Sequence, residues 1–192
     1  MKRIVVVFLL LVLLIAVSGC GNLSGLLFGM KSDADICDEQ MESFLNALEA
    51  QDTKSMIALF AQNAMIEAEN MAETVELLYS YYQGNYFSYD NWGATNSETT
   101  MENGYLQIEY YGTYDVTTNM GTYRFAFHYV AEDSFDEGNV GLNSIYVIKM
   151  EDDTDMQYAY RGDGLYTLGI QIGVPNTLPE EFGNDEMTYG TT

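Results

Sequence analysis

The pattern of apolar and polar residues changes twice along this chain. Residues 4–17 are continuously apolar, residues 33–83 repeat apolar positions at helical spacing, and residues 85–150 largely alternate apolar and polar positions. A spacing of three to four residues places apolar side chains on one face of a helix, and alternation does the same for a strand. The pattern therefore predicts an apolar leader, then helices, then a sheet.

Three amphipathic helices are predicted after residue 31. The first starts at Ser32 or Asp33, and its buried face is expected to carry Ile36, Met41, Phe44, Leu45 and Leu48. Asp52 is placed to cap a short second helix with Met56, Ile57, Leu59 and Phe60. The third is expected from about Glu67 to Gln83, with Gly84 ending it. Strands are predicted at 85–91, 94–101, 104–118, 121–131 and 140–150, with a last one near 165–172.

The hairpin around "TTNMGTY" decides which side chains share a face of the sheet. A two-residue turn at Asn119–Met120 creates an aromatic face of Tyr110, Tyr114, Val116, Phe125, Phe127 and Tyr129. The opposite face then carries Glu109, Tyr111, Asp115, Arg124 and His128. A three-residue turn closed by Gly121 would shift the register by one. In the two-residue register we expect the aromatic face to pack on the helices through Phe44, Leu48, Val75 and Leu78, because it is too apolar to face water.

The apolar leader has the features of a secretory signal peptide. Its 14 residues are fewer than the ~20 that a helix needs to span a bilayer, and Lys2 and Arg3 precede it. The exit, Val17-Ser18-Gly19-Cys20, resembles the lipobox of bacterial lipoproteins. That resemblance implies cleavage before Cys20, a diacylglycerol on its sulfur, and acyl chains such as palmitate that anchor the protein on the outer face of the cytoplasmic membrane.

Processing at this site defines the expected organisation of the chain. Residues 1–19 would be the signal peptide, 20–32 a lipidated tether, 33–175 a single domain, and 176–192 a loose tail. With Cys20 lipidated, Cys37 is the one remaining thiol, so no intrachain disulfide can form. A cysteine within a predicted helix is expected to be buried and inert.

Charge excludes one class of partner. After cleavage, 29 acidic residues stand against five basic ones, a net charge of −24. Nucleic-acid affinity depends largely on Lys and Arg that neutralise phosphates, so we do not expect this protein to bind nucleic acid.

The order of elements, helices followed by long strands, predicts an α+β fold with helices on a curved antiparallel sheet. It resembles the cone-shaped fold of nuclear transport factor 2 and its SnoaL-like and ketosteroid-isomerase-like relatives. "FLNALEAQDTKSMIALFA" and "VGLNSIYVI" resemble an uncharacterised family of bacterial lipoproteins with such a domain, over about residues 33–150. The resemblance implies a pocket between sheet and helices, for which we name Phe44, Tyr110, Tyr114, Phe125, Phe127 and Tyr129 as lining residues.

Candidate catalytic chemistry centres on His128, the chain's one histidine. With Asp115, Glu109 or Tyr111 it could act as a general base. The alternative is a strand histidine hydrogen-bonded to a tyrosine, outside the pocket, and the two-residue register favours this alternative with Tyr111 as the partner.

Other motifs predict little specific chemistry. The acidic stretches 131–138 and 151–155 lack the ligand spacing of a calcium loop and are interpreted as solvated loops. Arg161-Gly162-Asp163 matches an adhesion tripeptide but equally suits a tight turn. No cofactor or metal is expected.

Three functions are compatible with these observations. The leading hypothesis is a binding or interaction module without enzymatic activity, with a small apolar or aromatic ligand. An isomerase- or hydrolase-like enzyme that uses His128 with a nearby carboxylate or tyrosine is the alternative. A structural envelope protein whose acidic surface docks a basic protein is the third.

Overall fold

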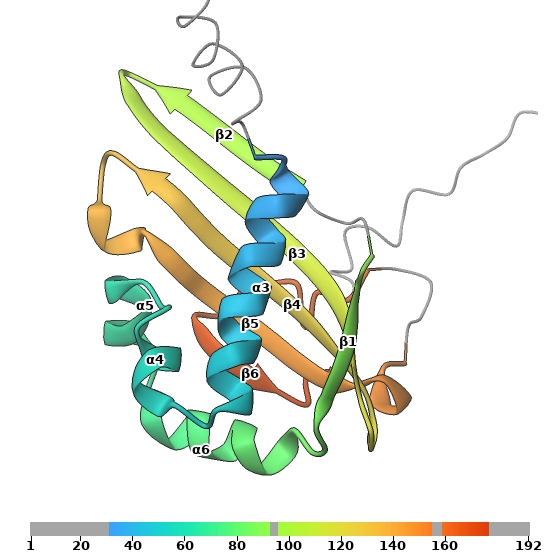
Figure 1. Ribbon diagram of the computed structural model, residues 1–192. Coiled ribbons are helices and arrows are strands. Elements are labelled where there is room, and N and C mark those ends of the chain that lie inside the picture. Colours follow the sequence, from blue (N-terminus) through green and yellow to red (C-terminus); the bar gives the residue numbers. More distant parts are fainter. Residues whose placement is uncertain (1–30, 93–95, 155–158, 177–192) are drawn as a thin grey trace, which may run out of the picture. The chain divides into compact units, whose positions relative to one another are not determined.

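A computed structural model describes residues 31–92, 96–154 and 159–176 of the chain. The chain divides into two compact units, Met1–Ser32 and Asp33–Thr192, and the elements below all belong to the second. In this unit the helices pack on a curved six-stranded sheet, as Figure 1 shows, so the predicted α+β fold is confirmed.

The helical region holds α3 (Asp33–Glu49), α4 (Thr53–Ile57), α5 (Gln62–Glu67) and α6 (Met71–Tyr81). The predicted cap of α4 is confirmed, because the Asp52 carboxylate accepts hydrogen bonds from the backbone N and the hydroxyl of Ser55, at 3.1 and 2.6 Å. The prediction of three helices is wrong in two places.

The first difference is α5, which the sequence pattern missed. The helical spacing around Phe60 is interrupted because this segment pairs with strand β5. The Ala61 backbone N donates to the carbonyl of Leu142 at 2.8 Å, and the Leu142 N donates to the carbonyl of Leu59 at 2.9 Å. The second difference is the start of α6, four residues later than predicted, because Asn70 adopts a left-handed conformation with φ of 55°.

The sheet consists of β1 (Tyr86–Asn91), β2 (Asn96–Glu102), β3 (Tyr105–Thr118), β4 (Gly121–Asp133), β5 (Gly141–Lys149) and β6 (Gly169–Ile172). Short 3-10 turns, η1 (Glu137–Asn139) and η2 (Met150–Asp152), flank β5. The strand order is β1-β3-β4-β5-β6, and β2 pairs with the first half of β3 while β1 pairs with the second half.

The last strand makes the sheet mixed, which corrects the predicted antiparallel sheet. β6 runs parallel to β5, with Ile145 opposite Ile170. A parallel neighbour requires a crossover connection, and this connection lies between the end of β5 at Lys149 and the start of β6 at Gly169. The predicted final strand near 165–172 is confirmed, although it is shorter than expected.

The register of the β3–β4 hairpin is the predicted one. Thr118 pairs with Gly121 across a two-residue turn, so Tyr114 lies opposite Phe125 and Tyr111 opposite His128. The alternative three-residue turn is therefore excluded for this hairpin.

The aromatic face packs on the helices, as predicted. Phe44, Leu48, Val75 and Leu78 are 0–2% exposed and share one core with Tyr114, Val116, Phe125 and Phe127. The ring of Phe44 meets the ring of Phe125 edge-on, with 6.2 Å between centroids. Burial of side chains of this size contributes about 1.5–3 kcal/mol each, so this core is the main source of stability.

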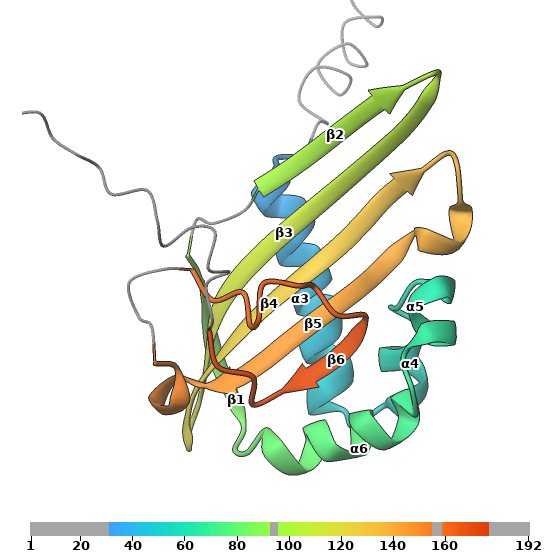
Figure 2. The same ribbon diagram turned by 180° about the vertical axis from the view of Figure 1, so that it is seen from behind.

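The opposite face of the sheet is covered by the segment that leads into β6. We call residues 159–168 the strap, and Figure 2 shows it crossing this face. The Thr113 hydroxyl donates to the carbonyl of Tyr160 at 3.1 Å, and the Tyr160 hydroxyl donates to the carbonyl of Val174 at 2.6 Å. A second, smaller core forms here from Ala126, Tyr146, Ile148, Tyr160 and Val174. Both faces of the sheet are thus partly buried.

Candidate functional site

The residues predicted to line a pocket lie in the helix-side core. Phe44, Tyr110, Tyr114, Phe125 and Phe127 are 0–8% exposed. Tyr129 is half-buried and stacks on Tyr110, with 6.3 Å between ring centroids. These side chains pack against one another, and whether any ligand enters among them stays a prediction.

A tyrosine and an aspartate meet at the edge of this core. The Tyr114 hydroxyl donates to Oδ1 of Asp38 on α3 at 2.7 Å, and the Asn91 amide donates to the same oxygen at 3.0 Å. Burial, followed by the hydrogen bond to Asp38, raises the pKa of Tyr114 above its usual value, so the phenol stays protonated. This network ties α3 to β1 and β3, and no pattern in the sequence predicted it.

Arg124 is the most buried cation on the opposite face. Its side chain is 1% exposed and lies between the carboxylates of Asp115, at 3.1 Å, and Asp153, at 2.5 Å. The Trp92 ring lies over its guanidinium, 4.3 Å from centroid to Cζ. Asp153 belongs to the acidic stretch predicted to be a solvated loop, and that interpretation is wrong for Asp153, because it compensates a buried charge.

His128 lies on the same face as Arg124 but forms a separate cluster. Its imidazole stacks on the Tyr111 ring at 4.8 Å between centroids, with 6° between the planes. Nε2 is 3.2 Å from Oε1 of Glu109, whose other oxygen accepts a hydrogen bond from the Tyr111 hydroxyl at 3.2 Å. His128 therefore lies beside Tyr111 on the face away from the helices, as predicted, but its hydrogen bond is to Glu109 and not to the tyrosine as expected. Asp115, which the sequence analysis grouped with them, pairs with Arg124 instead.

Burial dominates the ionisation of His128. It lowers the pKa below the usual 6.5, and the attraction of Glu109 opposes this only in part. The folded protein then binds fewer protons than the unfolded chain between the two pKa values, so stability should fall as pH drops below about 6.5 and level off below the folded pKa.

An NMR titration of the single imidazole measures this pKa directly. We expect a midpoint below 6.5, and a further decrease in Glu109→Gln, which removes the favourable charge. A midpoint above 6.5 in the wild type would show that Glu109, and not burial, controls the imidazole.

The strap is held by the hydroxyl of Tyr146. This hydroxyl donates to Oδ1 of Asp163 and accepts a hydrogen bond from the backbone N of Thr167, both at 2.7 Å. Gly162 rests against the ring, since a Cβ at this position would lie 2.1 Å from the Tyr146 ring. The turn interpretation of Arg161-Gly162-Asp163 is confirmed by the hydrogen bond from the Gly164 N to the Arg161 carbonyl, at 3.1 Å.

Tyr166 extends from the strap onto the histidine cluster. Its ring lies 5.1 Å from the ring of Tyr111 and 5.8 Å from that of His128, measured between centroids. Its φ of 51° is in the left-handed region, which bulky residues rarely adopt. Such strain persists only where the surrounding structure fixes it.

Between the strap and the sheet lies a cavity of about 190 Å³, which we call the strap cavity. Tyr111, Thr113 and neighbouring strand residues form its floor, and Glu98 on β2 forms part of the rim. The full lining is Glu98, Tyr111, Gly112, Thr113, Ala126, Phe127, Tyr160, Arg161 and Tyr166. Of the predicted pocket residues it includes Phe127, and of the predicted catalytic residues Tyr111.

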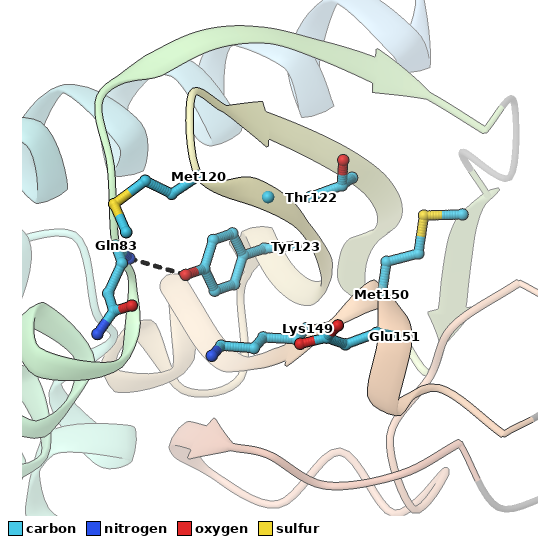
Figure 3. Close-up of a pocket in the computed structure, with 8 residues that line it drawn as sticks. Gln83, Met120, Thr122, Tyr123, Lys149, Met150 and Glu151 are labelled. Atoms are coloured by element: carbon cyan, nitrogen blue, oxygen red, sulfur yellow. Dashed lines mark hydrogen bonds between the residues drawn. The ribbon is translucent and has the colours of Figure 1, made fainter.

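A larger hollow, about 420 Å³, lies at the end of the sheet near the β3–β4 turn (Figure 3). Tyr123 occupies its centre, and its hydroxyl accepts a hydrogen bond from the Gln83 backbone N at 2.8 Å. The Lys149 ammonium lies 5.7 Å from the Tyr81 ring centroid. The hollow includes none of the predicted site residues.

The first acidic stretch is partly structural. Asp133 is 7% exposed, and its carboxylate accepts hydrogen bonds from the backbone of Phe135 and Asp136 and from the Asn139 amide. The solvated-loop interpretation is therefore wrong for Asp133. In the part of the chain that the structure describes, no group of three His, Cys, Asp or Glu residues is placed to hold a metal ion.

Cys37 is buried in the helix-side core, as predicted. Burial, and then the nearby charges of Asp33 and Asp38, raise the pKa of its thiol to about 12. A protonated thiol is a poor nucleophile, so Cys37 has a packing role.

Cys20 and the other lipobox residues lie outside the described residues, as does the tail from 177. Among the helices of the described part, none has the length and apolar character needed to span a membrane.

Comparison with protein families finds a match over residues 43–150 to DUF5104, a domain of unknown function. The match covers more than half of the chain, and the chain belongs to this family. A search of curated proteins found no match. The predicted relationship to an uncharacterised family is thereby supported.

Proposed function

We propose that this protein is a lipid-anchored, extracytoplasmic binding module, and that the strap cavity is its binding site. The lipobox at Val17–Cys20 supports the anchor. The strap cavity carries the proposal, because hydrogen bonds with Thr113 and Tyr146 hold the strap on the sheet around it. Small-molecule sites are typically preformed concavities with an apolar lining and a few placed polar groups.

Two features support the strap cavity over the hollow around Tyr123. The first is the lining by Tyr111, Tyr160 and Tyr166, each of which has an apolar ring face and a polar hydroxyl. In addition, Tyr166 is held in a strained backbone conformation over the cluster of Tyr111 and His128, as is frequent at ligand sites.

We also propose that the domain is a distant relative of the nuclear transport factor 2 fold. The order of elements, with helices before a curved sheet, supports this relationship. The proposed site differs from the pocket implied by that resemblance, because it lies on the sheet face opposite the helices.

Growth of the source bacterium with labelled palmitate tests the anchor. We expect label on the wild type and none on Cys20→Ala, because the thiol is the acceptor. Cys37→Ala should keep the label and serves as the matched control. Equal labelling of wild type and Cys20→Ala would refute the anchor.

A thermal-shift screen of small polar and aromatic compounds tests the binding site. At least one compound should raise the Tm of the wild type but not that of Tyr166→Ala, which removes a cavity wall. Tyr105→Ala is the control, since Tyr105 is an exposed tyrosine of β3 outside the strap cavity. Stabilisation that is equal in all three proteins would place binding elsewhere, and a screen without any stabilising compound would contradict the proposal.

A hydrolase-like enzyme is the second candidate, and Ser144 favours it. Ser144 lies directly opposite His128 in the β4–β5 pairing, and its buried hydroxyl has no hydrogen-bond partner among the described residues. Ser144 on β5 and Glu109 on β3 thus lie on either side of His128, and the three have the residue types of a serine nucleophile, its base and an orienting carboxylate. The hydroxyl is fully buried, which places this candidate second.

Labelling with a fluorophosphonate probe separates the two candidates. The binding proposal expects no adduct on Ser144 at neutral pH. A covalent adduct on Ser144 that is lost in His128→Gln would move the hydrolase to first place.

A further inference from the structure

Two side chains of opposite charge line the strap cavity. Glu98 projects from β2 and Arg161 from the strap, and both are exposed residues that line it. Within the described residues, no ion pair joins Glu98 to Arg161 or either of them to another side chain. Each charge is therefore available to a ligand group of the opposite sign.

Both charges act on the same wall of the cavity. Burial raises the pKa of the Tyr166 phenol, Arg161 lowers it in part, and Glu98 raises it. The phenol consequently stays protonated, and the ring of Tyr166 lies within the electrostatic reach of both groups.

The size of the cavity limits the ligand. A volume of about 190 Å³ is smaller than the ~300–1,000 Å³ of sites for drug-sized molecules. At roughly 30 Å³ for each water molecule, it holds on the order of six waters, or a ligand with a similar number of non-hydrogen atoms.

Ligands with a single charge fit these walls poorly. An anion would approach Glu98 and the nearby Glu109 on a chain with net charge −22. A cation would gain from Glu98 but meet the guanidinium of Arg161. A molecule with both charges satisfies both groups, because a guanidinium binds a carboxylate with two parallel hydrogen bonds.

We propose that the strap cavity binds a small zwitterion with an ammonium and a carboxylate group, of the size of a small α-amino acid. The carboxylate pairs with Arg161, the ammonium pairs with Glu98, and the aliphatic part rests against Tyr111 and Tyr166. This inference rests on the proposed binding function and names its ligand class.

Calorimetric titration with matched probes tests the ligand class. Glycine, L-alanine and L-valine carry both charges, whereas methylamine, ethylamine and isobutylamine lack the carboxylate, and acetate, propionate and isovalerate lack the ammonium. We expect at least one amino acid to bind at least tenfold more tightly than its amine and its acid, since each of these lacks one of the two groups that form charged hydrogen bonds with the protein.

Charge-removing variants locate the two contacts. Arg161→Gln should abolish the preference for the amino acid over its amine, and Glu98→Gln should abolish the preference over its acid. Lys54→Gln on α4 and Glu102→Gln on β2 are the matched controls, and both should retain wild-type affinities.

The outcomes separate the two proposals. If, in each of the three series, the amine or the acid binds as tightly as the amino acid, the zwitterion is overturned and the binding function still stands. Failure of all nine probes overturns the zwitterion, and the binding function fails as well if the thermal-shift screen finds no compound. Amino-acid binding that is unchanged in Arg161→Gln and Glu98→Gln also overturns the proposed contacts.

Discussion

Arg124→Met should lower the free energy of unfolding by about 3–5 kcal/mol, as expected when one partner of a buried ion pair is removed. The guanidinium is 1% exposed and forms ion pairs with both Asp115 and Asp153. Asp153 is fully buried at its side chain, so in the variant its carboxylate would stay inside the protein and lose the contact with the Arg124 guanidinium. The loss of the Trp92 contact adds to the effect.

Urea unfolding of wild type, Arg124→Met and Lys54→Met measures this loss. Lys54 is exposed, so Lys54→Met removes the same charge from the chain but leaves no buried carboxylate without its cation. A difference below about 1 kcal/mol between the two variants would be typical of a surface ion pair and would contradict the buried position of Arg124.

Gly162→Ala should be the most damaging single change in the strap. Its φ is +59°, and a Cβ would lie 2.1 Å from the Tyr146 ring. The left-handed conformation costs about 1–2 kcal/mol for a residue with a Cβ, and overpacking costs typically 1–3 kcal/mol more. We expect the free energy of unfolding to fall by about 2–5 kcal/mol in total. If the strap instead detaches from the sheet, the strap cavity is lost.

Gly173→Ala separates the cost of the left-handed backbone from the cost of the steric clash with Tyr146. Gly173 has a similar φ of +70°, but no described residue lies within 4 Å of a Cβ there, so only the cost of the left-handed backbone applies. Equal unfolding free energies for the two variants would show that the strap does not press on Tyr146. If Gly162→Ala detaches the strap, its stability loss is smaller, and ligand binding disappears.

The sequence was sufficient to predict the hairpin and the helix-side core. Alternation along β3 and β4, combined with one turn length, determines that Tyr114 faces Phe125 and Tyr111 faces His128, because side chains in strands alternate strictly. The helix boundary near Phe60 was not predictable in this way. It depends on pairing with Leu142, a contact between residues far apart in the chain.

In the candidate site, too, some contacts could be predicted from strand register and others could not. The contact of His128 with Tyr111 follows from register, whereas the strap that covers it does not. Residues 159–168 show no periodic pattern, and their position depends on the hydroxyl of Tyr146 and on Tyr160. Glu98, Arg161, Tyr166 and Ser144 were therefore missed, and a single signal, the glycine turn around Gly162, pointed to the segment.

The position of Tyr166 tests most directly whether the strap closes over the sheet. In a nuclear Overhauser experiment, the imidazole protons of His128 are one identifiable set, because the chain has a single histidine. With ring centroids 5.8 Å apart, we predict cross-peaks from these protons to both the Tyr111 and the Tyr166 rings, and loss of the second set in Tyr166→Ala. Cross-peaks to Tyr111 alone in the wild type would contradict a closed strap and the strap cavity with it.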